Sequence, residues 1–173
     1  MGNKTMKTVV SLAMVAGTLS VFGNVFLYEC EKFEEKGVWK ECAKSEKSAG
    51  SKALFADKEG DGAETTITTP GAGSCRSWIR TANLFATNEV PSKFTYQING
   101  EERPITVKGE RGRFVWVDGG LVMLPGGYSS IGIMPVKGSK AAVDCVVVTD
   151  EQDYRPPADE AGLKALRTTS TKE

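Results

Sequence analysis

The chain has 173 residues, enough for one domain with a sizeable core and too few for two domains of ordinary size. Its 22 lysine and arginine residues equal its 22 aspartate and glutamate residues, so we expect no broad basic surface for nucleic acid. The chain has no histidine, which excludes Ser-His and Cys-His catalytic pairs and histidine-ligated zinc and lowers the odds of an enzyme.

The N-terminal segment has the pattern of a secretory signal peptide. Lys4 and Lys7 precede the apolar run TVVSLAMVAGTLSVFG, which ends at Gly23. This run of about 16 residues is shorter than the roughly 20 that a membrane span needs. We expect cleavage after residue 23, with Gly17 as a second candidate, and a secreted or periplasmic domain that is free of the membrane.

The first stretch after this leader, NVFLYECEKF at residues 24–33, places two carboxylates on either side of a cysteine. In an extended strand Glu29 and Glu31 share one face, while Tyr28 and Cys30 share the other. Two like charges this close repel each other. We therefore expect a lysine, solvent or a bound cation to offset them.

Short runs rich in valine, threonine and aromatic residues alternate with glycine-rich turns along the rest of the chain. Many strands at this spacing predict an all-β sandwich or barrel. Asn99-Gly100 predicts a hairpin with a type I′ turn. We expect strands at residues 25–33, 38–42, 52–57, 64–69, 75–82, 93–98, 104–109, 113–118, 121–124, 128–134 and 142–149.

Two segments lie outside this pattern. Residues 82–94 form the longest irregular stretch in the middle of the domain, and long loops at the end of a sandwich often carry function. Residues 156–173 form a tail in which residues 158–167 have the pattern of a short amphipathic helix. We expect disorder at residues 168–173, although this tail is also a candidate attachment point for a partner.

The four cysteines are few enough to be considered individually. In an exported protein they permit two disulfides in three connectivities, and no Cys-x-x-Cys motif indicates redox chemistry or zinc binding. Buried free thiols are the alternative interpretation, because free cysteine is among the most buried residue types. The four residues are Cys30, Cys42, Cys75 and Cys145.

A series of weak motifs occurs in a fixed order: YECEKF, SAGSKALFAD, GAGSCRSWIRTA, FVWVDGGLVMLPGGYSSIGIM and VDCVVVTDEQDYRPP. In this order the chain resembles the jelly-roll carbohydrate-binding modules of families 6 and 35, which are galactose-binding-like sandwiches of two antiparallel sheets. The resemblance covers roughly residues 25–155 and implies a β-sandwich domain over residues 24–155. Cys75 stands where these modules usually have tyrosine, and Cys30 stands where a small apolar residue is common.

The resemblance also implies a structural calcium ion. In these modules the first and last strands are neighbours, and the corresponding ligands here are Glu29, Glu31 and Asp144. Calcium accepts six to eight oxygen ligands and would offset the repulsion among three carboxylates. The alternative is a solvated edge on which lysines pair with the glutamates. The same neighbour relation would place Cys30 and Cys145 together on the inward face, where they could form a disulfide.

Candidate carbohydrate-binding residues surround the glycine turn after RFVWVD. Trp116 is the expected platform for stacking a sugar ring, with Arg113 and Asp118 beside it and Asn83 and Asn88 in the long loop. Core packing is the competing interpretation of each tryptophan, and polar loop padding that of each asparagine.

Three functions follow from these patterns. The first is a secreted, non-catalytic β-sandwich that binds a polysaccharide or glycan and holds a structural calcium ion. The alternative is an extracellular structural or protein-interaction domain of the same fold without a sugar site. A glycosidase ranks third, because it needs two carboxylates across a cleft and this small sandwich has no long insertions to build one.

Overall fold

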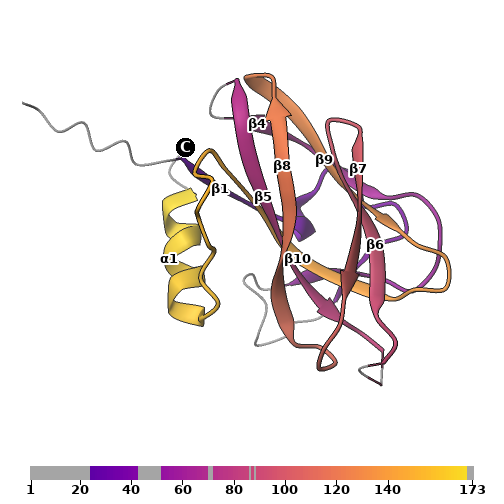
Figure 1. Ribbon diagram of the computed structural model, residues 1–173. Coiled ribbons are helices and arrows are strands. Elements are labelled where there is room, and N and C mark those ends of the chain that lie inside the picture. Colours follow the sequence, from indigo (N-terminus) through magenta and orange to yellow (C-terminus); the bar gives the residue numbers. More distant parts are fainter. Residues whose placement is uncertain (1–23, 43–51, 70–71, 86, 88, 171–173) are drawn as a thin grey trace, which may run out of the picture.

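Two antiparallel sheets pack against each other in the computed structural model, which describes residues 24–42, 52–69, 72–85, 87 and 89–170 (Figure 1). Six strands form the first sheet, in which β1 pairs with β10 and the others follow the order β2 (Lys40–Cys42), β3 (Ala53–Ala56), β10 (Ala141–Thr149), β5 (Gly73–Asn83) and β8 (Phe114–Leu124). The second sheet has four strands in the order β4 (Ala63–Thr69), β9 (Gly127–Pro135), β6 (Ser92–Ile98) and β7 (Glu101–Val107). The predicted all-β sandwich of two antiparallel sheets is confirmed.

The core lies between the two sheets and follows the side-chain alternation of the strands. In β6, Phe94, Tyr96 and Ile98 are buried in the core, while Thr95 and Gln97 between them are only partly buried. The hairpin from β6 to β7 turns at Asn99 and Gly100, whose φ angles are +47° and +78°. Positive φ at both positions is what a type I′ turn requires, so the predicted hairpin is confirmed.

The strand β10 is buried on both faces, and this explains its nearly continuous apolar sequence. Val143, Val146 and Val148 pack in the core between the sheets. Cys145 and Val147 pack on the opposite face, which we call the outer face of the six-stranded sheet. The register of β10 against β5 shifts between Val143 and Cys145, and such a bulge lets two successive side chains point to the same side.

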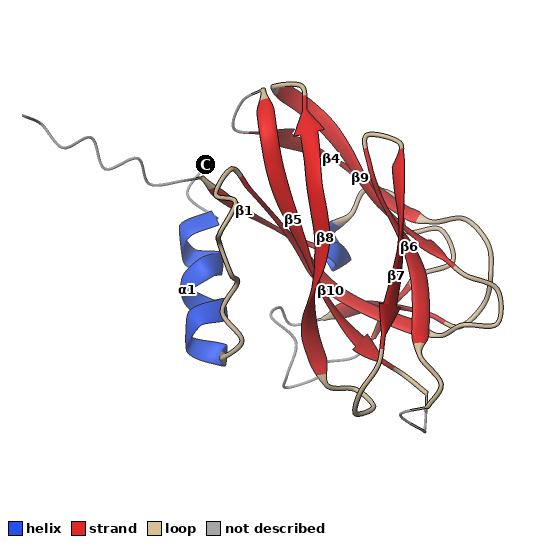
Figure 2. Ribbon diagram, in the orientation of Figure 1, coloured by secondary structure: helices blue, strands red, loops and turns tan. Residues whose placement is uncertain are grey.

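The helix α1 (Glu160–Ser170) covers part of this outer face (Figures 1 and 2). It packs through Leu163 and Leu166, as the amphipathic pattern predicts. The helix continues through Ser170, so the disorder predicted from residue 168 is wrong for residues 168–170, and residues 171–173 lie outside the described residues. No helix in the described ranges is both long and apolar enough to cross a membrane.

The first strand, β1 (Val25–Glu29), is shorter than predicted. It pairs antiparallel with β10, with Glu29 opposite Cys145, so the predicted neighbour relation between the first and last strands is confirmed. The chain then leaves the sheet in a 3₁₀ turn, η1 (Cys30–Lys32), and the predicted continuation of the strand to residue 33 is wrong. The predicted signal peptide at residues 1–23 lies outside the described residues.

The predicted break between residues 118 and 121 is a bulge within one continuous strand, β8. The register of β8 against β5 shifts beside Gly119 and Gly120, and Gly120 has a φ of +82°. The guanidinium group of Arg103 in β7 donates to the carbonyl oxygens of Gly119, at 2.6 Å, and of Leu121. This positive φ favours glycine at residue 120, and a Cβ atom there would also displace the guanidinium group of Arg103.

All four cysteines are free thiols, contrary to the predicted disulfides. The Cys30–Cys145 bridge is not formed because Cys30 turns into the core between the sheets, whereas the bulge in β10 directs Cys145 to the outer face against Leu163. Cys42 is half-buried, and its Sγ donates to the carbonyl oxygen of Ala53 at 3.1 Å. Burial raises the pKa of each of the four thiols.

Candidate functional site

Two of the three tryptophans lie on the outer face of the six-stranded sheet. Trp78 in β5 forms a buried cluster with Val147 and with Leu166 of α1, and Trp116 in β8 packs against this cluster. Trp39 is buried in the core, where it meets the ring of Phe94 edge to face at 6.3 Å. Core packing is therefore the role of Trp39, and the outer face carries the other two indole rings.

A cavity of about 350 Å³ opens beside these two rings, between β5, β8 and the segment that leads to α1. We call it the outer-face cavity. Three of its lining side chains are aromatic, three are arginines and none is a carboxylate. The lining residues are Trp78, Arg80, Arg113, Phe114, Val115, Trp116, Arg155, Pro156 and Ala158.

Two of the three arginines of the cavity stack on its aromatic rings. The guanidinium carbon of Arg80 lies 5.0 Å from the ring centroid of Phe114, and that of Arg155 lies 5.0 Å from the ring of Trp78. These are cation–π distances, at which the electron-rich face of the ring attracts the cation. Arg80 also pairs with the buried carboxylate of Asp144, so its charge is balanced from within the sheet.

The predicted platform Trp116 lies in the wall of the cavity instead of projecting freely into solvent. Its Nε1 donates to the carbonyl oxygen of Pro157 at 2.8 Å, which fixes the plane of the indole ring. The predicted partner Arg113 lines the same cavity. Its side chain is 69% exposed and lies 4.0 Å from the carboxylate of Glu110, an exposed pair that contributes little.

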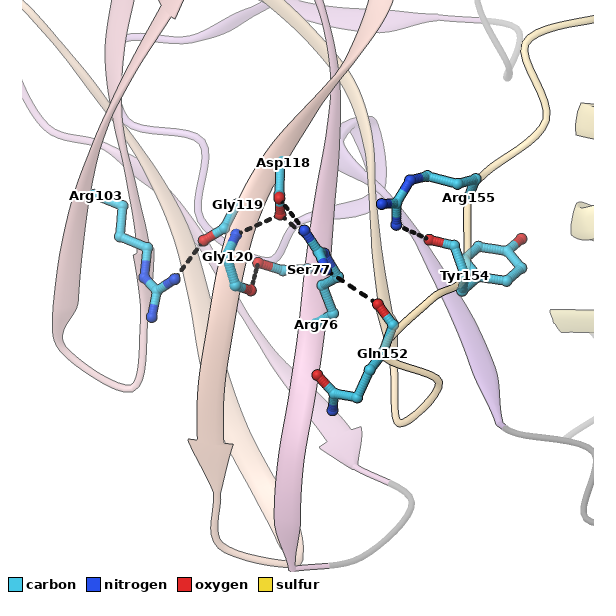
Figure 3. Close-up of polar contacts among 9 residues, drawn as sticks. All are labelled: Arg76, Ser77, Arg103, Asp118, Gly119, Gly120, Gln152, Tyr154 and Arg155. Carbon is cyan, nitrogen blue, oxygen red and sulfur yellow. Dashed lines mark hydrogen bonds and ion pairs between the residues drawn. The ribbon is translucent and has the colours of Figure 1, made fainter.

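Asp118, the second predicted partner, lies two residues beyond Trp116 on β8, outside the cavity lining, and forms its own network (Figure 3). Arg76 pairs with both of its carboxylate oxygens, at 3.2 Å from Nε to Oδ1, and donates to the carbonyl oxygen of Gln152 at 3.0 Å. Hydrogen bonds from Arg76 and from the backbone N–H of Gly120 lower the pKa of Asp118. Arg76 also lies over the ring of Trp78, at 5.3 Å, so this network adjoins the cavity.

The two predicted asparagines are not brought to the cavity. Asn83 is buried at the end of β5, where its Nδ2 donates to the carbonyl oxygen of Gly109 and its Oδ1 accepts from Ser92 and from the backbone of Phe85. Its polar atoms are used to order the neighbouring loops, which leaves no face for a sugar. Asn88 lies outside the described residues.

The three predicted calcium ligands converge at the junction of β1, η1 and β10. Glu29 and Asp144 lie on paired strands, and Glu31 follows in η1. Burial and, to a smaller extent, the nearby carboxylates of Glu29 and Asp144 raise the pKa of Glu31 to about 7, although a backbone hydrogen bond and Arg167 oppose this rise. One carboxylate oxygen of Glu31, Oε2, is buried and has no hydrogen-bond partner among the described residues.

Cations of the chain itself stand among these carboxylates. Glu29 pairs with Lys32 and with Arg167 of α1, at 2.9 Å from Nε to Oε1, and Asp144 pairs with Arg80. Calcium needs six to eight oxygen ligands. In the ranges that the structure describes, no group of three acidic or cysteine side chains is placed to hold a metal ion. The residues as arranged therefore do not fit calcium, whose binding stays a prediction.

Sequence analysis did not identify several residues of these two sites. Phe114 and Arg155 line the cavity, and Arg80 and Arg167 balance the acidic cluster. The Arg-Pro-Pro sequence six residues after the end of β10 was the available signal for Arg155, because a proline keeps the residue before it extended. No local signal marks Arg167, whose partner Glu29 is at the other end of the domain.

The fold is similar to that of solved carbohydrate-binding modules. A family 35 module from Clostridium thermocellum has a TM-score of 0.58 and 20% identity over 70% of this chain and 96% of that one. The C-terminal family 6 module of a marine laminarinase from Zobellia galactanivorans has a TM-score of 0.59 and 18% identity over 73% and 100%. A family 35-containing β-(1,4)-mannanase from Podospora anserina has a TM-score of 0.62 and 16% identity over 76% of this chain, which spans 29% of the mannanase.

The sequence itself matches no protein-family model and no curated protein. At 16–20% identity the likeness concerns the fold. At that level the predicted resemblance to the galactose-binding-like sandwiches of families 6 and 35 is confirmed.

Proposed function

We propose that this chain is a non-catalytic carbohydrate-binding domain whose ligand lies in the outer-face cavity. The observation that carries this proposal is the combination of aromatic rings and guanidinium groups in that cavity. The C–H face of a sugar ring stacks on an aromatic surface, while arginine donors bind hydroxyl or carboxylate oxygens. The likeness in fold to carbohydrate-binding modules supports the same function.

The cavity residues divide into two roles. Phe114 and Trp116 offer partly exposed ring surface, and Trp116 is held in place by its bond to Pro157. Arg113 and Arg155 are exposed and can turn their donors toward a bound sugar. Rings fixed by packing with mobile donors beside them make a site that is largely formed before the ligand arrives.

The charge of the cavity favours an acidic glycan over a neutral one. No carboxylate lines the cavity, and the charge of Arg80 is balanced by Asp144. Arg113 and Arg155 are then available for a carboxylate or sulfate group on the ligand. Binding that depends on this attraction weakens as the salt concentration rises.

The same lining supports a non-catalytic role. Hydrolysis of a glycosidic bond generally uses two carboxylates on either side of it, and none of the nine lining residues is aspartate or glutamate. The chain also has no histidine to act as an acid or base. Turnover of a polysaccharide by the purified protein would contradict this part of the proposal.

We place the domain outside the cytoplasm, as a secreted or periplasmic protein, on the basis of the N-terminal signal-peptide pattern. Its equal numbers of acidic and basic residues give no reason to expect nucleic acid as a partner. Mass spectrometry of the protein exported by an expression host tests both the export and the cleavage after residue 23. Retention of the intact chain in the cytoplasm would contradict the localisation.

Affinity electrophoresis on paired neutral and acidic polysaccharides tests the binding itself. We expect retardation by at least one acidic glycan, and a loss of roughly tenfold or more in affinity in Arg113→Ala and Phe114→Ala. Lys137→Ala is the matched control, because its side chain is 86% exposed and lies in a turn away from the cavity. Retardation that Tyr128→Ala abolishes and Arg113→Ala does not would place the site elsewhere.

A protein-interaction domain is the second candidate function, and one surface favours it. Leu121 and Met123 lie two residues apart on β8 and are 51% and 68% exposed. Two large apolar side chains on one face of an edge strand are typical of a contact surface. No retention on any glycan, together with a protein partner whose binding Met123→Ser abolishes, would favour this function over carbohydrate binding.

A further inference from the structure

We propose that Arg167 of α1 serves as the internal cation of the acidic cluster at Glu29, Glu31 and Asp144, so that this sandwich is stable without a calcium ion. The helix α1 would then stabilise the first strand of the sandwich, because Arg167 pairs with Glu29 at the end of β1. The inference does not depend on which ligand the outer-face cavity binds.

The cluster needs a cation because its carboxylates are close together and largely shielded from water. The side chain of Glu29 is 13% exposed, that of Asp144 is 1% exposed, and one oxygen of Glu31 is fully buried. Glu29 ends β1 beside Asp144 on the paired strand β10, and Glu31 follows in η1, so three like charges lie near one another and repel. Repulsion among partly buried charges is strongly destabilising unless an opposite charge stands among them.

The chain supplies that opposite charge from three elements. Arg80 in β5 pairs with Asp144, Lys32 in η1 pairs with Glu29, and Arg167 in α1 pairs with Glu29. Three cations therefore face three carboxylates, and the cluster is neutral without a metal. Lys32 is 72% exposed and contributes little, whereas Arg167 is 28% exposed and interacts with Glu31 as well as Glu29.

The packing of α1 fixes the position of this arginine. Leu163 packs against Cys145, and Leu166 packs against Trp78 and Val147 on the outer face. Arg167 follows Leu163 by four residues, so it lies on the same face of the helix and points toward the sheet. It is also in the last turn of α1, where the helix dipole stabilises a positive charge.

A calcium ion at this place would have to displace the guanidinium groups. The ion requires six to eight oxygen ligands at 2.3–2.6 Å, and ion pairs already engage Glu29 and Asp144. These existing pairs favour the arginines over the metal.

Thermal melts of the full mature chain test the proposal. The protein is dialysed against EDTA and melted, by circular dichroism, in buffer with and without added calcium chloride. We expect the same Tm in both buffers. A Tm that falls in EDTA and recovers with calcium would overturn the proposal.

A pair of variants on one helix tests the role of the arginine itself. Arg167→Gln should lower the Tm by roughly 4–8 °C, because it leaves a partly buried acidic cluster under-compensated. Lys164 is an exposed residue on the same helix, so Lys164→Gln should leave the Tm unchanged. Arg167→Lys should lower the Tm less than Arg167→Gln does, because lysine keeps the positive charge. Equal melting temperatures for Arg167→Gln and Lys164→Gln would overturn the proposal independently of the calcium result.

Discussion

Two arginine–aspartate pairs on the same sheet differ in burial, and burial determines how much an ion pair contributes to stability. Asp144 is 1% exposed and pairs with Arg80, which is 7% exposed, whereas Asp118 is 39% exposed and pairs with Arg76. Water screens the second pair and not the first. Both pairs join a guanidinium group to a carboxylate, and burial is the main difference between them.

We expect Asp144→Ala to lower the free energy of unfolding by about 3–5 kcal/mol, because it removes the buried carboxylate that pairs with Arg80. Urea unfolding at neutral pH measures this value. Asp118→Ala is the matched variant and should have a much smaller effect. Equal losses of unfolding free energy in Asp144→Ala and Asp118→Ala would contradict the expected effect of burial.

Glu31 gives the protein a pH dependence whose sign follows from its raised pKa. The carboxyl group ionises near its ordinary value of 4.5 in the unfolded chain and near about 7 in the folded protein. The folded state therefore binds more protons between these values, and the free energy of unfolding falls as the pH rises through this window. Above about pH 7 the contribution is constant.

Replacing Glu31 by glutamine should remove this slope. We expect Glu31→Gln to be more stable than the wild type at pH 8, by about 1 kcal/mol once solvent screening of a half-buried group is discounted, and to match it at pH 4. Urea unfolding of both proteins across pH 4–8 measures the difference. A difference that is the same at every pH would show that Glu31 does not ionise within this window.

Thiol counting tests the redox state of the chain. We expect all four cysteines to react with a thiol reagent in denaturant without prior reduction, and only half-buried Cys42 to react readily in the folded protein. The other three thiols are buried, and burial raises their pKa values, so they should be slow. Fewer than four reactive thiols in denaturant would reveal a disulfide.

At the scale of residues, the sequence predicted that the first and last strands meet, but it did not predict the side of Cys145 or the burial of Asn83. The convergence of Glu29 and Asp144 followed from a likeness that places the first and last strands together, and the structure confirms that pairing. The side of Cys145 could not be predicted, because one bulge reverses the alternation that the prediction assumed. Asn83 was predicted from its place in a long loop, yet its side chain is buried as an organiser of that loop.

At the scale of elements, α1 connects the two regions of interest. Leu166 packs against Trp78, which lines the outer-face cavity, and Arg167 beside it pairs with Glu29 of the acidic cluster. The helix was predicted from its amphipathic pattern, but the face it covers was not. A sequence pattern shows that a helix has an apolar side and cannot show which sheet receives it.

Leu166→Ala should therefore affect both stability and binding. We expect a loss of about 2–4 kcal/mol in the free energy of unfolding, because the substitution leaves a cavity beneath α1. We also expect weaker glycan binding, because Trp78 loses its support. Urea unfolding and affinity electrophoresis measure the two effects, with Lys164→Ala as the exposed control on the same helix. If Leu166→Ala loses stability while its affinity for the glycan is unchanged, the helix does not support the cavity.

At the scale of the whole molecule, the fold could be predicted and the cavity could not. Short strands separated by glycine-rich turns predicted an all-β sandwich, and the ordered motifs predicted its type. The cavity combines Trp78, Phe114 and Arg155, which lie in three segments far apart in the sequence. Such a site exists only when strand order and the path of the tail are known, so residue patterns within one segment could not reveal it.

The most direct test of a carbohydrate site at this cavity is a nuclear magnetic resonance titration that follows the three tryptophan indole N–H signals. A glycan that retards the protein in electrophoresis is added to the ¹⁵N-labelled chain. We predict that the signals of Trp78 and Trp116 shift with saturation while that of Trp39, buried in the core, does not. Saturable binding that leaves both outer-face signals in place would contradict a sugar site in the outer-face cavity.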